Sequence, residues 1–246
     1  MLNSRFNYSI IFLLFLLFGC TGHSRDPIGR YMAPPEPLTS DDVIIVKQLS
    51  DFDTSTNLEH WYIETDDVQK NERGEPGNSI GFIFQVTGYE SIGALRVNYT
   101  LGPSYQYRYV NVGIGDAKYV GVVGKDLMLD VSDYDGIHFW MKGSGNEVRL
   151  KIFTKAQYLG PYPASVSDTT NSRNYNWDAF GYWYEKTPRE WTEYFVLFSS
   201  LYQEGWGKKS TFDKSHVTKI LFETASMING ETGYFLIDDV SFFVLK

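Results

Sequence analysis

The stretch that decides the fold is DGIHFWMKGSGNEVRLKIF, residues 135–153. Each half alternates between two sets of side chains, and the segment Gly-Ser-Gly-Asn separates the halves. Such alternation places one set on a buried face of a β-strand and the other set on the opposite face. In the second half, Leu150 and Ile152 would be buried, with Arg149 and Lys151 outside. We therefore expect a β-hairpin at the centre of a sandwich, with a polar and aromatic face left unburied.

Further strands are predicted on both sides of this stretch, at intervals of about ten to fifteen residues and separated by Gly, Asn, Asp and Pro. Their ranges are 43–49, 80–86, 93–101, 107–114, 127–131, 179–185, 191–198, 217–224 and 233–245. The ranges 80–86 and 93–101 should form a hairpin, and a bulge is expected at Asp238-Asp239. These features predict an all-β fold, a single β-sandwich of two antiparallel sheets over residues 42–246.

The N-terminal residues predict export and a lipid anchor. Residues 10–18 form an unbroken apolar run, which is far shorter than the roughly 20 residues of a membrane-spanning helix. We interpret residues 1–19 as a secretory signal peptide. Cys20, the single cysteine of the chain, follows Leu17-Phe18-Gly19. This pattern resembles the bacterial lipobox, in which the cysteine is lipidated, whereas the alternative is an ordinary signal peptide with an incidental cysteine.

Residues 20–41 are interpreted as the lipidated cysteine and a flexible tether. They show no periodicity, and Pro34, Pro35 and Pro37 make part of the segment stiff and extended. Acyl chains, palmitate among them, on Cys20 would hold the protein at a membrane that the polypeptide does not cross. We therefore expect the folded part at a bacterial cell envelope, on the outer membrane or the cell surface.

The composition argues against several classes of function. The chain carries 22 Lys and Arg against 30 Asp and Glu, a net charge of −8, and no basic stripe. Nucleic acid is therefore not an expected partner. The four histidines lack metal-type spacing and no Gly-x-Ser-x-Gly motif occurs, so catalysis finds little support. A glycosidase would need two carboxylates facing each other at roughly 5 to 10 Å, which a sequence cannot show.

An ordered series of motifs points to a known family. The series comprises LDVSDYDGI (129–137), FWMKG (139–143), VRLKI (148–152), Trp191 before FVLFSSL, QEGWG (203–207), ILF (220–222) and FLIDDV (235–240). Together these resemble the family 11 carbohydrate-binding modules and related galactose-binding-like jelly rolls, over residues 42–246. They are also similar to the complex I intermediate-associated protein 30 domain. The first resemblance implies a jelly-roll sandwich that binds poly- or oligosaccharide on a concave sheet face without cleaving it.

Aromatic and charged residues on the central stretch are candidate ligand contacts. Sugar rings stack their C–H groups on aromatic faces, and their hydroxyl groups need polar partners around them. Trp140, Arg149 and Lys151 meet these needs, since each should point away from the core. The alternative is a solvated face with mixed charges, which is common in antiparallel sheets.

The strand at 179–185 and the loop before it should add further contacts. The strand carries Tyr182 and Tyr184 on one parity and Trp183 on the other. The resemblance favours the two tyrosines as cleft residues, while the residues alone leave the exposed parity open. The long aromatic loop 155–178 contains Tyr158 and Trp177, predicted ligand contacts, although a surface excursion covering one end of the sandwich is the alternative.

Two further predictions concern a lone tryptophan and a group of acids. Trp206 lies between two glycines, and a structural plug under a loop is favoured over a stacking platform. The acids that we expect to bind a structural calcium ion, which commonly bridges the first and last strands in the family resembled, are Asp51, Asp53, Asp238 and Asp239. The alternative is carboxylates bonded to backbone amides or to a lysine.

The sequence thus predicts a lipid-anchored glycan-binding protein. Its task would be to hold poly- or oligosaccharide near the surface for uptake or for partner enzymes, so glycan-degrading enzymes and transporters are expected neighbours. An envelope adaptor of the intermediate-associated protein 30 type is the main alternative. A glycoside hydrolase or lyase is a third class.

Overall fold

The computed structural model describes residues 37–54, 61–66, 73, 75, 77–105, 107–115, 129–157, 178–184, 186–226 and 230–246. The strands within these ranges are β1 (Val43–Ser50), β2 (Tyr62–Thr65), β3 (Ile80–Val86), β4 (Ala94–Thr100), β5 (Arg108–Gly115), β6 (Gly136–Gly143), β7 (Val148–Thr154), β8 (Phe180–Tyr184), β9 (Thr192–Leu197), β10 (Val217–Ser226) and β11 (Thr232–Leu245). Three short 3₁₀ helices are η3 (Lys155–Gln157), η5 (Phe198–Ser200) and η6 (Lys214–His216). In this part of the chain, no helix has the length and apolar character needed to cross a membrane.

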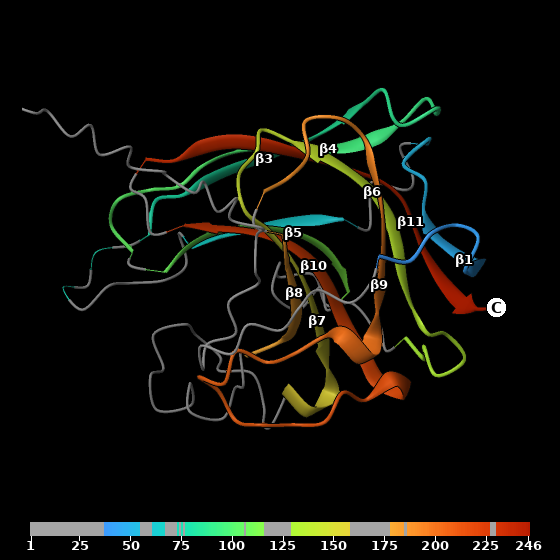
Figure 1. The fold of residues 1–246 in the computed structure, drawn as a ribbon. Coiled ribbons are helices and arrows are strands. Elements are labelled where there is room, and N and C mark those ends of the chain that lie inside the picture. The colour runs from blue at the N-terminus through green and yellow to red at the C-terminus, as the bar shows by residue number, and fades with distance from the viewer. Residues whose placement is uncertain are drawn as a thin grey trace, which may run out of the picture.

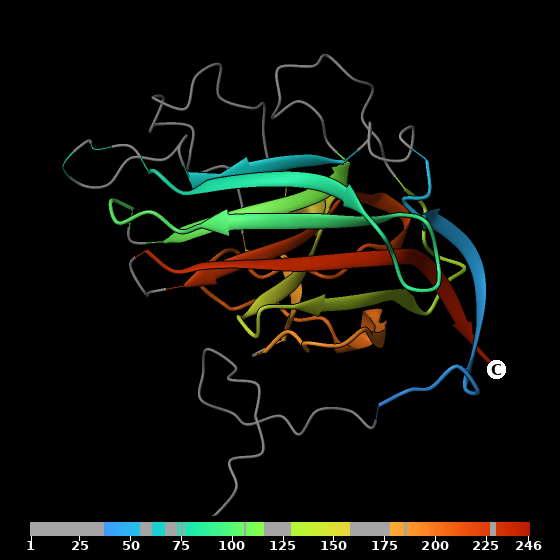
Figure 2. The same ribbon diagram turned by 90° about the horizontal axis from the view of Figure 1, so that it is seen from above.

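The strands form two antiparallel sheets that pack face to face, as predicted (Figure 1). Sheet 1 has the order β3-β4-β11-β6-β9, and β1 also pairs with β11. Sheet 2 has the order β2-β5-β10-β7-β8. Figure 2 shows β3, β4, β11 and β6 side by side in that order, with β1 along the C-terminal half of β11. The predicted all-β sandwich is therefore confirmed.

The strand registers confirm two details of the sequence prediction. β3 and β4 form the expected hairpin, with Ile80 opposite Thr100 and Val86 opposite Ala94. The ladder between β11 and β6 shifts between Asp238 and Ser241, which is the predicted bulge. One strand was missed, because β2 is only four residues long and falls in a segment without clear alternation.

The predicted hairpin between the two halves of 135–153 is wrong. β6 pairs with β11 and β9 in sheet 1, whereas β7 pairs with β10 and β8 in sheet 2. The Gly-Ser-Gly-Asn segment therefore carries the chain across the sandwich, and Gly145 has the left-handed φ of 92° that this crossing uses. Alternation and turn residues are the same for a hairpin and for an arch between sheets, so the pattern alone did not separate them.

The core lies between the sheets and fixes which side chains remain outside. Phe139 of β6 packs edge to face on Phe222 of β10, with ring centroids 4.9 Å apart. Trp61 stacks on the same Phe222 ring at 6.4 Å. Burying each such side chain contributes roughly 1.5–3 kcal/mol. Because neighbouring residues in a strand point to opposite faces, this core turns Arg149 and Trp140 outward on opposite sides of the molecule.

Candidate functional site

The outer face of sheet 2 carries three buried charged residues, Arg149, Lys219 and Glu223. On β7, Leu150 and Ile152 enter the core while Arg149 and Lys151 lie outside, as predicted. In the neighbouring strand β10, Glu223 lies opposite Arg149 in the ladder. We call the outer residues of this sheet the ion-pair face, which consists of Glu64, Asn111, Arg149, Lys151, Lys219 and Glu223.

Two ion pairs cross between strands within this face. Lys151 Nζ lies 2.9 Å from Glu223 Oε2, and Lys219 Nζ lies 3.1 Å from Glu64 Oε1. These contacts are shielded from water by the surrounding side chains, since Lys219 and Glu223 are both buried. Shielding from water strengthens such charge-assisted hydrogen bonds. The strands therefore hold fixed charges of both signs at defined positions.

A third ion pair joins the face to the loop after β9. Arg149 is only 2 % exposed, and its Nη1 atom lies 3.0 Å from Glu204 Oε1. Its Nη2 atom donates a hydrogen bond to the main-chain oxygen of Ala179 at 3.2 Å. A Cβ atom at Gly181 would come within 2.2 Å of Arg149 Nε, so glycine is required there. The guanidinium group thus lies across β8 in the space that a side chain would otherwise fill.

Asn111 of β5 provides an unsatisfied polar group in the middle of the face. It lies opposite Glu64 on one side and Glu223 on the other, and it is 5 % exposed. Its Oδ1 atom has no hydrogen-bond partner in the described part of the chain. Buried acceptors are rarely left without a partner. The face therefore has capacity for at least one further hydrogen bond.

The loop 203–207 presents an exposed aromatic ring at the edge of the face. Buried Asp178 accepts hydrogen bonds from the main-chain N–H groups of Glu204, Gly205 and Gly207 at 2.8, 2.8 and 3.1 Å. Trp206 Nε1 donates to Glu204 Oε2 at 2.7 Å, although the tryptophan is 60 % exposed. The predicted plug is therefore wrong. Asp178 holds the loop in place by accepting hydrogen bonds from its main-chain N–H groups, so the Trp206 ring is not needed to pack beneath it.

The predicted ligand residues separate into those that the ion-pair face brings together and those that it does not. Arg149 and Lys151 lie in it, and Trp183 pairs with Arg149 in the register of β8. Tyr182 lies opposite Leu150 and packs against the core, and burial raises the pKa of its hydroxyl group. The expectation that Tyr182 faces the cleft is therefore wrong. Tyr182 is on the side of β8 that faces the core.

The remaining predicted contacts lie elsewhere or cannot be placed. Trp140 belongs to sheet 1, where its ring stacks on Tyr89 with centroids 3.6 Å apart. Tyr184 pairs with Val148, on the core parity of β8, and its side chain is not described. Tyr158, Trp177 and the lipidation site Cys20 lie outside the described residues.

Sequence reasoning missed most of the ion-pair face. Lys219 and Glu223 flank an apolar run in β10. Because they are four residues apart, they lie on the same face of the strand, and this pattern could have indicated a charged outer face. Glu204 was part of a recognised motif, but nothing in that motif indicates that it reaches Arg149. Asn111 and Glu64 became visible as a pair only when the register of β2 and β5 was known.

The four acids predicted to bind calcium do gather near the bulge of β11. Asp239, with a left-handed φ of 48°, has its pKa raised by burial and by the negative charges of Asp51 and Asp53. Asp53 Oδ1 accepts from the N–H of Gly93 at 2.8 Å. Their carboxylate oxygens are the ligand type that calcium takes. Asp51 Oδ1 likewise accepts from the N–H of Asp53 at 3.1 Å, so two of these acids already have backbone partners.

Asp238 shows the same competition between backbone donors and an ion. It is fully buried, and its Oδ2 atom accepts from the N–H of Tyr89 at 2.8 Å and the hydroxyl of Ser91 at 2.9 Å. Burial nevertheless raises its pKa to about 6. The residue types suit calcium, but no group of three or more His, Cys, Asp or Glu side chains in the described part of the chain is arranged to hold a metal ion. The backbone contacts match the alternative, so calcium stays a prediction.

Comparisons with known proteins address the fold. No protein-family profile matches the chain. Endoglucanase 3 of Fibrobacter succinogenes is 27% identical over 193 residues, which is 71% of this chain and 24% of that protein. This chain therefore corresponds to about a quarter of the length of the endoglucanase.

Two solved structures of carbohydrate-binding modules from Clostridium thermocellum are similar in fold. A family 11 module in complex with a β-1,3-1,4-mixed-linked tetrasaccharide is 19% identical, with 80% of this chain and 94% of that one covered and a TM-score of 0.51. A family 11 module of a cellulosomal cellulase is 17% identical, with 82% and 96% covered and a TM-score of 0.49. The first of these two structures shows that the chain has the jelly-roll β-sandwich fold of a family 11 carbohydrate-binding module.

Proposed function

We propose that this protein binds a neutral poly- or oligosaccharide at the ion-pair face of sheet 2 and does not cleave it. The observation that carries the proposal is the exposed Trp206 ring, which is hydrogen-bonded to Glu204 and through it linked to Arg149. A sugar ring stacks on such an aromatic face. Its hydroxyl groups both donate and accept, so they find partners in fixed carboxylates and cations beside the ring.

The balance of charge selects neutral ligands. The three cations Arg149, Lys151 and Lys219 are each paired with a glutamate. An anionic glycan would meet as many carboxylates as cations and would have to break an existing ion pair. A neutral glycan can hydrogen-bond to Glu204 and Glu64, the more accessible members of two of these pairs, without separating a pair.

The comparisons support carbohydrate as the ligand class. One solved relative of the same fold was determined with a mixed-linked tetrasaccharide, and one curated relative is named an endoglucanase. Glu64 and Glu223 of the ion-pair face, and Glu204 of the adjoining loop, are each engaged by a cation. Such carboxylates are placed to hold hydroxyl groups, whereas a glycosidase needs one carboxyl group that delivers a proton.

Affinity electrophoresis tests this proposal. Native gels containing mixed-linked β-glucan, laminarin or xylan should retard the protein, and gels containing alginate should not. Trp206→Ala should abolish retardation without changing the melting temperature, because the ring is exposed. The matched control is Phe82→Ala on sheet 1, where the ring is 58% exposed. A protein that migrates freely in every glycan gel contradicts the proposal, and release of reducing ends by pure protein would assign it an enzymatic function.

A lipid anchor on Cys20 is the proposed attachment to the cell envelope. The apolar run 10–18 and the lipobox-like Leu17-Phe18-Gly19-Cys20 support it. At the surface, the glycan would be held close to glycan-degrading enzymes or transporters. Labelling cells with radioactive palmitate should mark the wild-type protein and leave Cys20→Ser unlabelled and absent from the membrane fraction. Label retained by Cys20→Ser rules this attachment out.

A calcium ion near the bulge of β11 is proposed as a structural element. Asp51, Asp53, Asp238 and Asp239 would supply carboxylate oxygens to it. Binding to the folded state alone stabilises a protein by mass action. Chelation with EGTA should therefore lower the melting temperature, and added Ca²⁺ should restore it. A melting temperature that changes with neither EGTA nor Ca²⁺ contradicts the proposed calcium site.

A further inference from the structure

Strand β1 presents a patch of exposed aliphatic side chains at one end of sheet 1. The strand pairs with the last part of β11, where Val43 lies opposite Leu245 and Ile44 opposite Val244 (Figure 2). The members of this patch, which we call the β1 patch, are Ile44, Ile45, Val46 and Leu245, with exposed fractions of 51, 46, 52 and 45 %. A cluster of exposed apolar side chains is typical of an interaction site.

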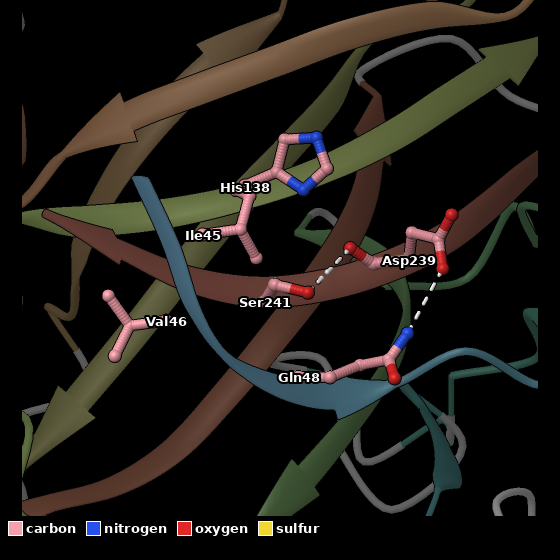
Figure 3. A pocket seen from close by; sticks show the side chains of 6 residues that line it. All are labelled: Ile45, Val46, Gln48, His138, Asp239 and Ser241. Atoms are coloured by element: carbon pink, nitrogen blue, oxygen red, sulfur yellow. Dashed lines mark hydrogen bonds between the residues drawn. The ribbon is translucent and has the colours of Figure 1, made fainter. Parts of the chain in front are cut away.

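At the β1 patch the aliphatic side chains border open space instead of the core. The register with β11 shifts between Ile45 and Lys47, and a bulge of this kind bends the strand that carries it. Ile45 and Val46 line a pocket of about 430 Å³, which Figure 3 shows together with its polar lining, Gln48, His138, Asp239 and Ser241. Within the described residues, β11 is the only strand that pairs with β1. The sandwich itself therefore does not cover this patch.

The tether joins the sandwich beside the β1 patch. The main-chain N–H of Lys246 donates to the main-chain oxygen of Asp42 at 3.1 Å, and Lys246 Nζ donates to that of Asp41 at 2.7 Å. These bonds hold the residues before β1 against the end of β11. A segment as long as residues 20–42 spans roughly 25 Å as a coil and at most about 75 Å when fully extended. A bilayer that holds Cys20 is therefore within reach of the patch.

We propose that the β1 patch docks on the surface of the lipid bilayer to which the protein is anchored, with its aliphatic side chains at the boundary between headgroups and acyl chains. This inference rests on the proposed lipid anchor at Cys20. The patch alone is too small to hold a free protein, because even a single myristoyl chain binds a membrane only marginally and reversibly. A tether makes docking intramolecular, with an effective concentration on the order of millimolar, so a weak apolar contact suffices.

Apolar contact, and not charge, would hold this end of the sandwich on the bilayer. Lys47 and Lys246 are exposed beside the patch, but Asp41 and Asp42 are exposed there as well. An anionic membrane would therefore attract and repel this end together, and docking should be the same on neutral and on anionic vesicles. Because the ion-pair face belongs to the other sheet, the docked protein keeps that face open to glycan.

Fluorescence quenching by lipid tests the docking. The full-length lipidated protein is reconstituted into phosphatidylcholine vesicles that contain a doxyl-labelled lipid. Cys20 is the single natural cysteine and is acylated in the anchored protein, so Ile44→Cys adds one free thiol for a polarity-sensitive fluorophore. At least about half of the emission should be lost, because an interfacial side chain lies roughly 5–10 Å into the boundary that the doxyl group reaches. Phosphatidylglycerol in the vesicles should not change this loss.

Phe82→Cys is the matched control at another exposed apolar position of sheet 1. The Phe82 ring is 58 % exposed and lies opposite Asn98, which pairs with Tyr234, ten residues before Val244 on β11. Ten residues of strand span roughly 30 Å, so a label at position 82 should keep its emission. Val46→Asp in the Ile44→Cys background should restore the emission without changing the melting temperature, because it places a charge in a side-chain position that is already half exposed.

Flotation of the vesicles separates failure of the docking from failure of the anchor. Protein that floats with the vesicles while the label at position 44 keeps its emission overturns the docking and leaves the anchor standing. Equal quenching at positions 44 and 82 also overturns it, because no one face would then meet the lipid. A blue shift at position 44 without lipid quenching, growing with the number of proteins per vesicle, would assign the patch to a second copy of this chain. Protein that does not float shows that the anchor fails, and the docking falls with it.

Discussion

β6 and β7 follow each other in the chain and share one alternating pattern, yet they build different surfaces on opposite sides of the sandwich. On β7, Arg149 and Lys151 enter ion pairs with glutamates. On β6, the outward Trp140 stacks on Tyr89, and Lys142 Nζ lies 4.7 Å from the centroid of the Trp191 ring. One strand thus contributes to a charged network and the other to an aromatic cluster.

The neighbouring strands cause this difference. β10 places Glu223 beside β7, whereas β9 places Glu193 opposite Trp140 and beside His138. The outward residues of one strand therefore form a site only together with the outward residues of the strands that pair with it. The strand order of the two sheets decides which chemistry each face acquires.

Removing Arg149 should give the largest effect. Arg149→Ala deletes a side chain that is 2 % exposed and leaves Glu204 without this partner. Breaking a buried pair costs on the order of 3 kcal/mol. The corresponding change on the other face, Lys142→Ala, removes a cation–π contact worth about 1 kcal/mol or less. Urea unfolding of both variants measures the difference, and equal losses would contradict the contrast between the two faces.

Asp238, which lies opposite Trp140 in sheet 1, should make the free energy of unfolding of the protein depend on pH. Burial raises its pKa from 3.8 to about 6, and its hydrogen-bond donors are neutral N–H and O–H groups. Between these values the folded protein keeps a proton that the unfolded chain has released. The free energy of unfolding therefore falls as the pH rises from about 4 to about 6, by up to about 3 kcal/mol.

This pH dependence is best measured by urea unfolding in the presence of a chelator, so that no bound cation opposes it. Asp238→Asn should remove the slope. Glu223→Gln, which removes a carboxylate of sheet 2 and leaves Asp238 in place, is the matched control and should keep the slope. Parallel curves for the wild type and Asp238→Asn would show that the acid does not titrate in this range.

Much of the fold followed from the sequence because alternation is a local property. The strands other than β2, the bulge at Asp238-Asp239 and the outward direction of Arg149 all depend on residues close together in the chain. The pairing partners of β6 and β7 depend on β10, β11 and β9, which lie far along the chain. The same short alternating pattern fits either arrangement, so the hairpin was predicted where an arch occurs.

The candidate site was harder to predict for the same reason. Tyr182 was expected in the cleft, but the register with Leu150 sends it to the core. Trp206 was expected under a loop, but Asp178 satisfies that loop from below through main-chain N–H groups. Each outcome depends on a contact between distant segments. The residue types indicated that aromatic rings would contact a ligand. The strand pairing and the loop contacts determine which of these rings are exposed.

Gly181→Ala should disturb the charged side by displacing Arg149. The added Cβ would lie 2.2 Å from Arg149 Nε, and overpacking of this kind costs about 1–3 kcal/mol. In an Arg149→Ala background the same change should cost much less, because the clashing group is gone. A double-mutant cycle by urea unfolding measures this coupling. Additive losses would show that the glycine is needed for some other reason.

Trp140→Ala should have the smallest effect on stability and the clearest meaning for function. The stack on Tyr89, with ring centroids 3.6 Å apart, is worth about 1 kcal/mol. Because Trp140 lies on sheet 1, its loss should leave retardation in neutral glycan gels unchanged, whereas Trp206→Ala should abolish it. Reduced retardation in Trp140→Ala, with an unchanged fold, would mean that glycan binds the aromatic side. The placement of the glycan site on sheet 2 would then fail.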